Sequence, residues 1–330
     1  MKLRIAQFGL GPIGIETLKL AALKPWAEII GGVDNDPAKT GQDLGLLTGK
    51  KSLHGRRVWA SLKELVARER PDIIFHTAVS KFKDAFGQLE PMARYGISVV
   101  SSSEELLFPR LREPRLAAKL DRLCRKTGAR IIGTGVNPGF VMDLLPICLT
   151  GVSQSVRAIH IQRVVNASTR RPSLQRKIGS GLPPALFRRL LKRGEAGHAG
   201  LKESLALVAH CLGWSLGSII ETGDAIVADN PIRTESVEVK PGQTCGLHQR
   251  AGATVNGRIC LTLDLKIYLD AKDPHDAVQI EGEPPLNLLI SGGVAGDQAT
   301  VAALVNTAPR LLQAPPGLLL MTDLPVPRIA

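Results

Sequence analysis

The chain has 330 residues, of which 44% are hydrophobic and 22% charged, and its formal net charge is +12 at pH 7. This composition is typical of a folded globular protein and excludes a disordered chain. No apolar run reaches the length of a membrane span, and an apolar strand begins as early as Leu3. We therefore expect no signal peptide, no membrane partner and a cytoplasmic location.

The cysteines and the basic residues exclude two further classes of protein. The five cysteines are scattered without the spacing of a metal site, so we expect reduced thiols and no metal. The basic residues are spread along the chain, apart from concentrations at 163–177 and 188–193, and no nucleic-acid recognition motif accompanies them. We expect no nucleic-acid partner, and a positive field that attracts an anionic cofactor or substrate.

The first 140 residues alternate between strand and helix patterns, which predicts a parallel, doubly wound α/β domain of the Rossmann type. The ligand of such a sheet lies at the carboxyl ends of its strands. The predicted strands are 3–8, 28–33, 72–77, 97–101 and 130–133, and the predicted helices are 13–23, 62–68, 86–95 and 114–126.

From about Asp143 the pattern changes to longer alternating stretches, which predicts an α+β domain with a mixed or antiparallel sheet. The domains are therefore expected at 1–142 and 143–298. The C-terminal segment, about 299–330, begins with an expected helix at 299–312 that a proline turn at 314–317 ends, and this helix is expected to pack back on the first domain. The expected strands of the second domain are 158–165, 236–240 and 259–269, and its expected helices are 184–192 and 201–212.

The first strand runs into a turn with the G-x-G-x-x-G spacing of a dinucleotide-binding loop. Gly9 lets the chain turn, Gly11 lets the backbone approach a pyrophosphate, and Gly14 lets the next helix lie close to the sheet. The helix start, with its free N–H groups, then faces the phosphates. The turn residues expected to bind the cofactor are Gly9, Gly11, Pro12, Ile13 and Gly14.

Asp34, twenty residues beyond the turn at the end of the second strand, is placed to hold the ribose hydroxyls. The alternative is an ordinary glycine-rich turn with Asp34 capping a loop. Asp34 would repel a 2′-phosphate and so slightly favours NAD, while Lys39, together with Arg56 and Arg57, leaves NADP open.

Two later strands end in loops that carry candidate polar groups. After the strand at 72–77, Thr77 and Ser80 are expected to bond the pyrophosphate or ribose, whereas His76 is interpreted as a buried histidine with its partners satisfied. After the strand at 97–101, Glu104 and Glu105 stand where the nicotinamide is expected, and either could act as a base. The alternative is a capping box, because Ser101 to Glu104 and Ser102 to Glu105 have its spacing.

The third such loop, 133–140, is rich in glycine and ends in an apolar segment. Asn137 could orient the carboxamide of the nicotinamide or the substrate, with Phe140 and Met142 as an apolar wall. The alternative is a plain linker between domains.

In the second domain, basic and amide residues gather at 163–171 and 175–181, where they could clamp a substrate carboxylate. A solvated loop is the alternative there, and helix entry is the alternative for His198. Residues 273–276 are expected to form a turn. The expected pocket residues are Asn166, Arg170, Gln175 and His198.

Taken together, several motifs resemble the dihydrodipicolinate-reductase-like superfamily, and more narrowly the 2,4-diaminopentanoate dehydrogenases and native amine dehydrogenases. In the first domain the motifs are the glycine turn, Val33-Asp34-Asn35-Asp36-Pro37, Ser103-Glu104-Glu105-Leu106 and Gly135-Val136-Asn137-Pro138-Gly139. The remaining motifs are Gln175-Arg176-Lys177-Ile178-Gly179, Gly197-His198-Ala199-Gly200 and Ala314-Pro315-Pro316-Gly317. The resemblance therefore spans nearly the whole chain.

The resemblance implies a Rossmann domain, a C-terminal α+β domain of dihydrodipicolinate-reductase type that binds substrate and forms a homodimer, and NAD or NADP as cofactor. It implies reductive amination of a small ketone or aldehyde with ammonia, and the reverse oxidative deamination of an amine. The catalytic acid/base role falls on Glu104 or Glu105, and Glu104 is nearer the strand end. The His-His-x-x-Lys and Lys-x-Asp-x-Pro-Ser-Gly-Thr segments of true dihydrodipicolinate reductases are missing, which disfavours lysine biosynthesis.

Two alternatives remain open at this point. The chain could be a non-catalytic dinucleotide-sensing protein, or a dehydrogenase or reductase of the same fold that acts on another small carbonyl or imine. A carbohydrate dehydrogenase is disfavoured because the Glu-Lys-Pro segment of that family is absent.

Overall fold

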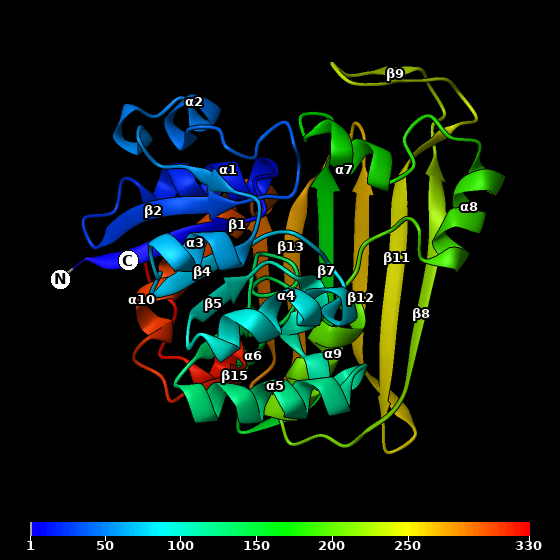
Figure 1. The fold of residues 1–330 in the computed structure, drawn as a ribbon. Coiled ribbons are helices and arrows are strands. Elements are labelled where there is room, and N and C mark those ends of the chain that lie inside the picture. Colours follow the sequence, from blue (N-terminus) through cyan, green and yellow to red (C-terminus); the bar gives the residue numbers. More distant parts are fainter. Residues whose placement is uncertain (1) are drawn as a thin grey trace. The chain divides into compact units, whose positions relative to one another are not determined.

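A computed structural model describes residues 2–330; Met1, the first residue of the expected dinucleotide-binding domain, lies outside the described residues. The chain divides into two compact units, Met1–Phe140 with Ala295–Ala330 (unit 1) and Val141–Val294 (unit 2). Figure 1 shows the elements of both. Among residues 2–330, no helix has the length and hydrophobicity needed to cross a membrane.

Unit 1 is built on a seven-stranded parallel sheet with the order β15-β6-β5-β4-β1-β2-β3, which confirms the predicted Rossmann-type fold. Its strands are β1 (Leu3–Phe8), β2 (Ala27–Val33), β3 (Val58–Trp59), β4 (Ile73–His76), β5 (Ser98–Ser101), β6 (Arg130–Gly133) and β15 (Gly317–Leu319). Its α-helices are α1 (Pro12–Ala21), α2 (Leu44–Thr48), α3 (Leu62–Arg68), α4 (Phe82–Arg94), α5 (Pro114–Thr127) and α10 (Gly296–Leu311). Short 3₁₀ turns are η1 (Lys51–Leu53), η2 (Glu104–Leu107), η3 (Pro109–Leu111) and η4 (Met321–Asp323).

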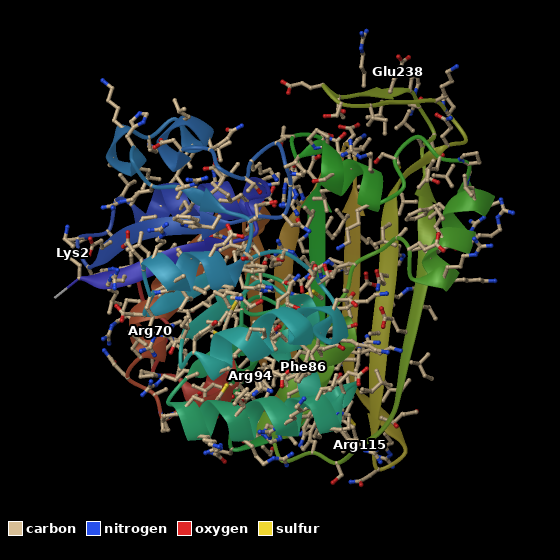
Figure 2. The ribbon with its side chains drawn as sticks, in the orientation of Figure 1. Lys2, Arg70, Phe86, Arg94, Arg115 and Glu238 are labelled. Carbon is tan, nitrogen blue, oxygen red and sulfur yellow. The ribbon has the colours of Figure 1, made fainter. Side chains whose placement is uncertain are left out.

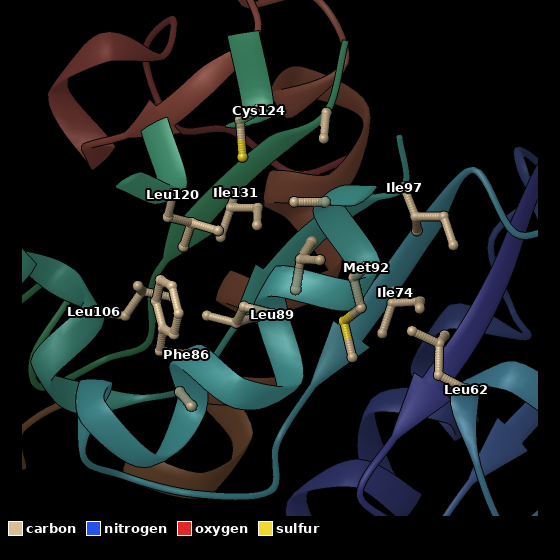
Figure 3. Close-up of a cluster of buried hydrophobic side chains, with 14 of the residues drawn as sticks. Leu62, Ile74, Phe86, Leu89, Met92, Ile97, Leu106, Leu120, Cys124 and Ile131 are labelled. Atoms are coloured by element: carbon tan, nitrogen blue, oxygen red, sulfur yellow. The ribbon is translucent and has the colours of Figure 1, made fainter. Parts of the chain in front are cut away.

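Runs of consecutive apolar residues explain why the strands of unit 1 are buried. Ile73, Ile74 and Phe75 of β4 have no exposed surface, as expected for a parallel strand covered on both faces. On one face, side chains of α4 and α5 interdigitate with the sheet (Figure 3). The labelled members include Leu89, Met92, Leu120, Cys124 and Ile131. Apolar residues recur along these helices at the helical period of 3.6 residues. They cover this face of the sheet and give unit 1 a continuous core.

The C-terminal segment contains the helix expected before the proline turn, followed by a strand that was not predicted. α10 ends at Leu311, and the chain then adds β15 beside β6, pairing Leu318 with Ile131. Pro315 and Pro316 cannot continue a helix, and the buried Leu318 and Leu319 complete the edge of the sheet instead. α10 itself packs against α1 and β5.

Unit 2 contains a six-stranded mixed sheet of order β14-β13-β7-β12-β11-β8, in which β7 and β12 are parallel and the other neighbours antiparallel. This confirms the predicted mixed sheet. Its strands are β7 (Ser155–Asn166), β8 (Leu216–Val227), β11 (Thr244–Val255), β12 (Arg258–Tyr268), β13 (His275–Glu283) and β14 (Leu286–Ser291). A separate ribbon pairs β9 (Ile232–Arg233) with β10 (Glu238–Val239), and the helices are α6 (Leu144–Thr150), α7 (Pro172–Lys177), α8 (Pro184–Arg193) and α9 (Leu201–Cys211).

Alternation along β12 explains the two faces of this sheet. Leu261, Leu263 and Leu265 are buried, and α9 packs against β12, β11 and β8. The intervening residues Thr262 and Asp264 are half-exposed. A strand with this period has one face on the core and one facing solvent.

The prediction of a turn at 273–276 is wrong for residues 275 and 276. β13 begins at His275, so Asp276 lies inside the sheet. Asp276 is only 4% exposed and pairs with Arg163 on β7. The Asp-Pro pair suggested a turn, but the buried ion pair draws the following residues into the strand.

Positive charge is distributed over unit 1. Figure 2 shows Lys2, Arg70, Arg94 and Arg115 on separate segments, and all four side chains belong to exposed residues. A dispersed positive surface raises the local concentration of anionic small molecules without forming a single dedicated patch.

Candidate active site

One row of paired residues closes the carboxyl ends of five strands in unit 1. Phe8 pairs with Val33 on one side and with His76 on the other, His76 pairs with Ser101, and Ser101 pairs with Gly133. The loops that follow these residues therefore leave the sheet at the same edge. β1 lies between β2 and β4, so the chain reverses its direction of travel across the sheet here, where α/β proteins bind their ligands.

The glycine turn has the geometry that its spacing predicts. Gly9 has φ +87°, a conformation that favours glycine, and its N–H donates to Val33 O at 2.9 Å. A Cβ on Gly14 would lie 2.0 Å from Gly9 O, whereas a Cβ on Gly11 would meet nothing within 4 Å. Gly14 thus brings α1 against the turn, and Gly11 leaves open space beside the backbone.

The N-terminus of α1 is available to an anion. Its first helical hydrogen bond runs from Ile15 N to Gly11 O, so the amides of Ile13 and Gly14 precede the first helix donor. Pro12 occupies the first turn, where its missing N–H costs nothing. An open turn with unused helix-start amides fits a dinucleotide pyrophosphate.

Gln7, which the sequence analysis did not identify, ties the turn to the loop after β4. Its Nε2 donates to Gly9 O at 3.0 Å and to Thr77 Oγ1 at 2.8 Å, and the Thr77 hydroxyl donates to Gly9 O at 2.9 Å. The Thr77 hydroxyl therefore braces the glycine turn, and its expected bond to the cofactor stays a prediction. A glutamine with no exposed surface in an otherwise apolar strand was the clue.

Asp34 lies directly against the glycine turn. Its Oδ2 accepts from Leu10 N at 2.7 Å and its Oδ1 accepts from Asp36 N at 2.9 Å, with Lys39 Nζ 3.3 Å from Oδ2. Burial opposes the charge on Lys39, but the carboxylates of Asp34 and Asp36 outweigh it and raise the pKa of Lys39. At β3, which pairs with β2, the Cζ atom of Arg57 lies 5.1 Å from the centroid of the Trp59 ring.

His76 is a buried histidine with both ring nitrogens satisfied, as its apolar strand predicted. Nδ1 lies 2.8 Å from Ser101 Oγ and Nε2 lies 2.6 Å from Gln88 Oε1. Burial lowers the pKa of His76 to about 4. The imidazole is therefore neutral at physiological pH and acts as a hydrogen-bonding group within the core.

The two glutamates after β5 have different environments. Glu105 is buried, its Oε2 accepts from Phe82 N at 2.9 Å, and its Oε1 lies 3.3 Å from Arg112 Nε. It therefore caps α4 and holds Arg112, which the sequence analysis did not identify. Glu104 is half-buried and is the first residue of η2.

Neither proposed capping box forms. The residue before η2 is Ser103, and its side chain makes no cap to that turn. Ser101 Oγ instead accepts from Ser103 N at 3.1 Å, and Ser103 Oγ donates to Ser80 O at 2.9 Å. Three consecutive serines permitted several local caps, and the contacts with neighbouring strands selected a different one.

The loop after β6 is tightly folded. A Cβ on Gly139, which has φ +127°, would lie 2.3 Å from Gly135 N. Among the described residues, the buried Asn137 Oδ1 and Thr134 Oγ1 have no hydrogen-bond partner. Buried polar atoms normally form hydrogen bonds. Two buried oxygens without a partner, just beyond the carboxyl end of β6, therefore fit a polar ligand such as a carboxamide.

In unit 2, two of the predicted pocket residues shape their own loop. Gln175 is 2% exposed; its Nε2 donates to the carbonyls of Ala167, Ser168 and Arg170, and its Oε1 accepts from Thr234. Asn166 bonds Ala271 O and Ser168 N. Met142 has no exposed surface, which places it in the core, whereas Phe140 in unit 1 is half-buried.

His198, another of the predicted pocket residues of unit 2, has a ring nitrogen that makes no hydrogen bond to the described residues. Its Nε2 is buried and has no partner among the described residues, while Gln249 holds its backbone N and O at 3.0 and 2.8 Å. Burial, followed by the cations Lys177 and Arg163, lowers the pKa of His198 to about 3. The positive charge of Arg170 acts on Arg163 in turn. Arg170 therefore joins Lys177 and Arg163 in one group of cationic side chains.

Known proteins resemble this chain over its whole length. A 2,4-diaminopentanoate dehydrogenase from Acetoanaerobium sticklandii is 29% identical over 99% of the chain and 94% of that protein. An amine dehydrogenase from Streptomyces virginiae is 24% identical over 97% of the chain and 95% of that protein. The structure of an amine dehydrogenase from Mycobacterium smegmatis matches with a TM-score of 0.89 and 25% identity, covering 100% of this chain and 98% of that one.

These matches confirm the resemblance that the motifs indicated. The family model of the 2,4-diaminopentanoate dehydrogenase C-terminal domain matches residues 140–330, more than half of the chain. The chain therefore belongs to the 2,4-diaminopentanoate dehydrogenase family defined by that domain.

Proposed function

We propose that this chain is an NAD(P)-dependent oxidoreductase that acts on CH–NH₂ groups. It oxidises a small amine to a carbonyl with release of ammonia, and in reverse aminates a small ketone or aldehyde. The observation that carries this proposal is Glu104, an acid/base candidate on the loop edge that also carries the glycine turn and Asp34. Membership of the family and the two named amine dehydrogenase relatives support the same chemistry.

The residues present fit a nicotinamide dinucleotide. The turn from Gly9 to Gly14 and the first amides of α1 would hold the pyrophosphate, and Asp34 would accept from the ribose hydroxyls. Asn137, with its orphan Oδ1, would bond the carboxamide, and Ser80 remains a proposed ribose contact. The bound cofactor supplies hydride acceptance from an amine carbon, or donation in the reverse direction.

Glu104 would handle the protons. As a carboxylate it would remove a proton from the substrate ammonium, because only the free amine can lose hydride to become an iminium. It would release that proton to solvent, then accept a proton from the water that adds to the iminium carbon and donate it to the nitrogen that leaves as ammonia. In the reverse direction the same carboxyl would return protons as ammonia replaces the carbonyl oxygen. Glu105 is excluded from this role in the proposal because its two oxygens face Phe82 and Arg112.

Within unit 2, His198 and Arg170 are the proposed substrate contacts, and Phe140 remains a proposed apolar contact within unit 1. The neutral His198 ring offers an unpaired Nε2 beside Lys177 and Arg163. This concentration of positive charge would favour an amine that also carries a carboxylate. Asn166 and Gln175 are proposed to shape the loop and not to touch the substrate.

The half-exposed face of the unit 2 sheet would pair with a second copy of the chain. By register, Leu289 shares a row with Asp264, and Ile220 shares a row with Thr262. Leu289 and Ile220 are 64% and 60% exposed, and a homodimer would cover them. Light scattering on the purified protein tests this: a wild-type dimer that becomes a monomer in Leu289→Arg supports it, and a wild-type monomer contradicts it.

A substrate panel tests the activity. Purified protein with NAD or NADP would be offered simple aliphatic amines and diamino acids, and the reduced nicotinamide followed by its absorbance. We expect amine-dependent reduction with release of ammonia, and in reverse a requirement for ammonium. Dinucleotide binding without turnover on any substrate would favour the sensing alternative, and carbonyl reduction without ammonium would favour a carbonyl reductase.

A further inference from the structure

His76 begins a hydrogen-bond network that none of the proposed chemical steps uses. It is the last residue of β4, has no exposed surface and stacks on Phe8 with the ring centroids 5.5 Å apart. Its partners come from two different elements: Ser101 ends β5, and Gln88 lies in α4. A buried side chain that joins three elements restricts the position of each.

The partners determine where the protons lie. Gln88 Oε1 can only accept, so His76 Nε2 carries the hydrogen. Nδ1 is then an acceptor, and it takes the hydroxyl proton of Ser101. With its proton used in this way, Ser101 Oγ presents a lone pair to Ser103 N at 3.1 Å. Burial keeps the ring in this neutral form by lowering the pKa of His76 to about 4.

The network reaches both chain neighbours of Glu104. Ser103 is held through its N–H by Ser101 and through its hydroxyl by Ser80 O at 2.9 Å. Ser80 O also accepts from Glu105 N at 3.2 Å. The backbone is therefore fixed immediately before and immediately after Glu104, and His76 sets the direction of the Ser101 hydroxyl that begins this arrangement.

We propose that His76 and Ser101 are positioning residues for Glu104, which they orient through the Ser103 backbone without touching the substrate. The inference rests on the proposed function, in which Glu104 is the acid/base group. A base that is misplaced by a fraction of an ångström loses much of its effect, because proton transfer needs hydrogen-bond reach to the reacting nitrogen. The expected loss is therefore in kcat and not in dinucleotide binding.

Two amide replacements separate this role from simple core packing. In His76→Asn the side-chain oxygen would overlay Nδ1, which preserves an acceptor for the Ser101 hydroxyl. In His76→Gln the side-chain nitrogen would overlay Nε2, which preserves the donor to Gln88 and removes the acceptor for Ser101. Ser101→Ala removes the hydroxyl itself with almost no change in volume, so it tests the same link without altering the histidine.

The experiment measures kcat and KM for the amine, dinucleotide Kd and Tm for these three variants and for Glu104→Gln. We expect His76→Gln and Ser101→Ala to lower kcat by about tenfold or more, the low end of the effect of losing a positioned acid/base group. Dinucleotide Kd should stay within about twofold of wild type, which corresponds to less than about 0.5 kcal/mol. His76→Asn should restore most of the lost kcat.

The outcomes are distinguishable. Wild-type kcat in His76→Gln and Ser101→Ala, with activity lost in Glu104→Gln, would overturn this inference and leave the proposed function intact. Equal losses of kcat and Tm in His76→Asn and His76→Gln would show a packing role only, and would also overturn it. Wild-type kcat in Glu104→Gln would instead overturn the proposed function on which the inference rests.

Discussion

Glu105 accepts a hydrogen bond from the Phe82 amide at 2.9 Å, across 23 residues of sequence. The carboxylate therefore satisfies the first turn of α4, where negative charge is favoured by the helix dipole. This contact distinguishes two adjacent glutamates that are chemically identical in the sequence. It assigns Glu105 to the architecture of the loop and makes Glu104 the residue to test as the base.

Glu104→Gln should lower kcat by about 100-fold or more, because general acid/base groups contribute about that much, with Tm and dinucleotide Kd unchanged. Glu105→Gln is the matched control. Its carbonyl can still accept from Phe82 N, so it should retain turnover and lose a little Tm with the Arg112 pair. Steady-state kinetics and thermal unfolding check both variants, and a larger kcat loss in Glu105→Gln would contradict the assignment.

Alanine substitutions at Gly14 and at Gly11 should have different effects on Tm and on dinucleotide affinity. A Cβ at Gly14 would collide with the backbone oxygen of Gly9 at 2.0 Å, so Gly14→Ala should lower both Tm and dinucleotide affinity. A Cβ at Gly11 meets no protein atom within 4 Å, so Gly11→Ala should keep the wild-type Tm and lose affinity. Calorimetric titration with dinucleotide, alongside thermal unfolding, measures this. Undiminished binding by Gly11→Ala would argue against a pyrophosphate at the turn.

Asp34 should set the choice between the two dinucleotides. Asp34→Ser removes the carboxylate that repels a 2′-phosphate and frees Lys39 from one of its two partners. The ratio of NADP to NAD affinity should therefore rise by about tenfold, a change of about 1.4 kcal/mol. Asp36→Asn serves as the control, because it removes the other partner of Lys39 and leaves Asp34 in place. An unchanged ratio in Asp34→Ser would contradict a ribose contact.

Acid should destabilise the fold through buried histidines. Because the pKa of His76 falls to about 4 in the folded chain, the unfolded chain binds more protons between about pH 6.5 and pH 4. The stabilisation is thus complete above about pH 6.5 and is lost as the pH falls, by at most about 3 kcal/mol for His76. His198, whose pKa falls to about 3, adds in the same direction.

Urea unfolding at about pH 7 and about pH 5 measures this dependence. The variant His76→Asn cannot titrate in that range, so its stability should fall less than that of the wild type between the two conditions. An equal fall in both proteins would show that His76 is not the group responsible.

The buried pair of Arg163 and Asp276 should matter most when one partner is removed. Arg163 donates to Asp276 Oδ1 and to Val294 O, and Val294 N donates to Asp276 Oδ2, so the pair holds the last residue of unit 2. Asp276→Asn leaves a buried cation without its counter-charge and should cost about 3–5 kcal/mol. The double variant Arg163→Met/Asp276→Leu should cost less. Urea unfolding compares them, and a double variant less stable than Asp276→Asn would contradict this account.

The local pattern of the chain was sufficient for most of unit 1, although it did not predict β3 or β15. The turn from Gly9 to Gly14 follows an apolar strand and precedes an amphipathic helix, and short-range sterics alone determine such a unit. Strands at 3–8 and 130–133 were therefore predicted with their observed bounds. The strands of unit 2 from Leu216 to Val227 and from Leu286 to Ser291 were missed, because half-exposed strands carry a weak apolar pattern and depend on their neighbours for stability.

The amino-acid sequence by itself therefore determined the fold class, the glycine turn and the family, because the motifs that indicate them are each made of residues close together in the chain. Only the tertiary structure decided the roles within the site. Glu105 is a cap because Phe82 lies beside it, Thr77 braces the turn because Gln7 reaches it, and Asp276 is buried because Arg163 faces it. Each of these contacts joins segments 23 or more residues apart, and such pairings exist only once the strands have aligned.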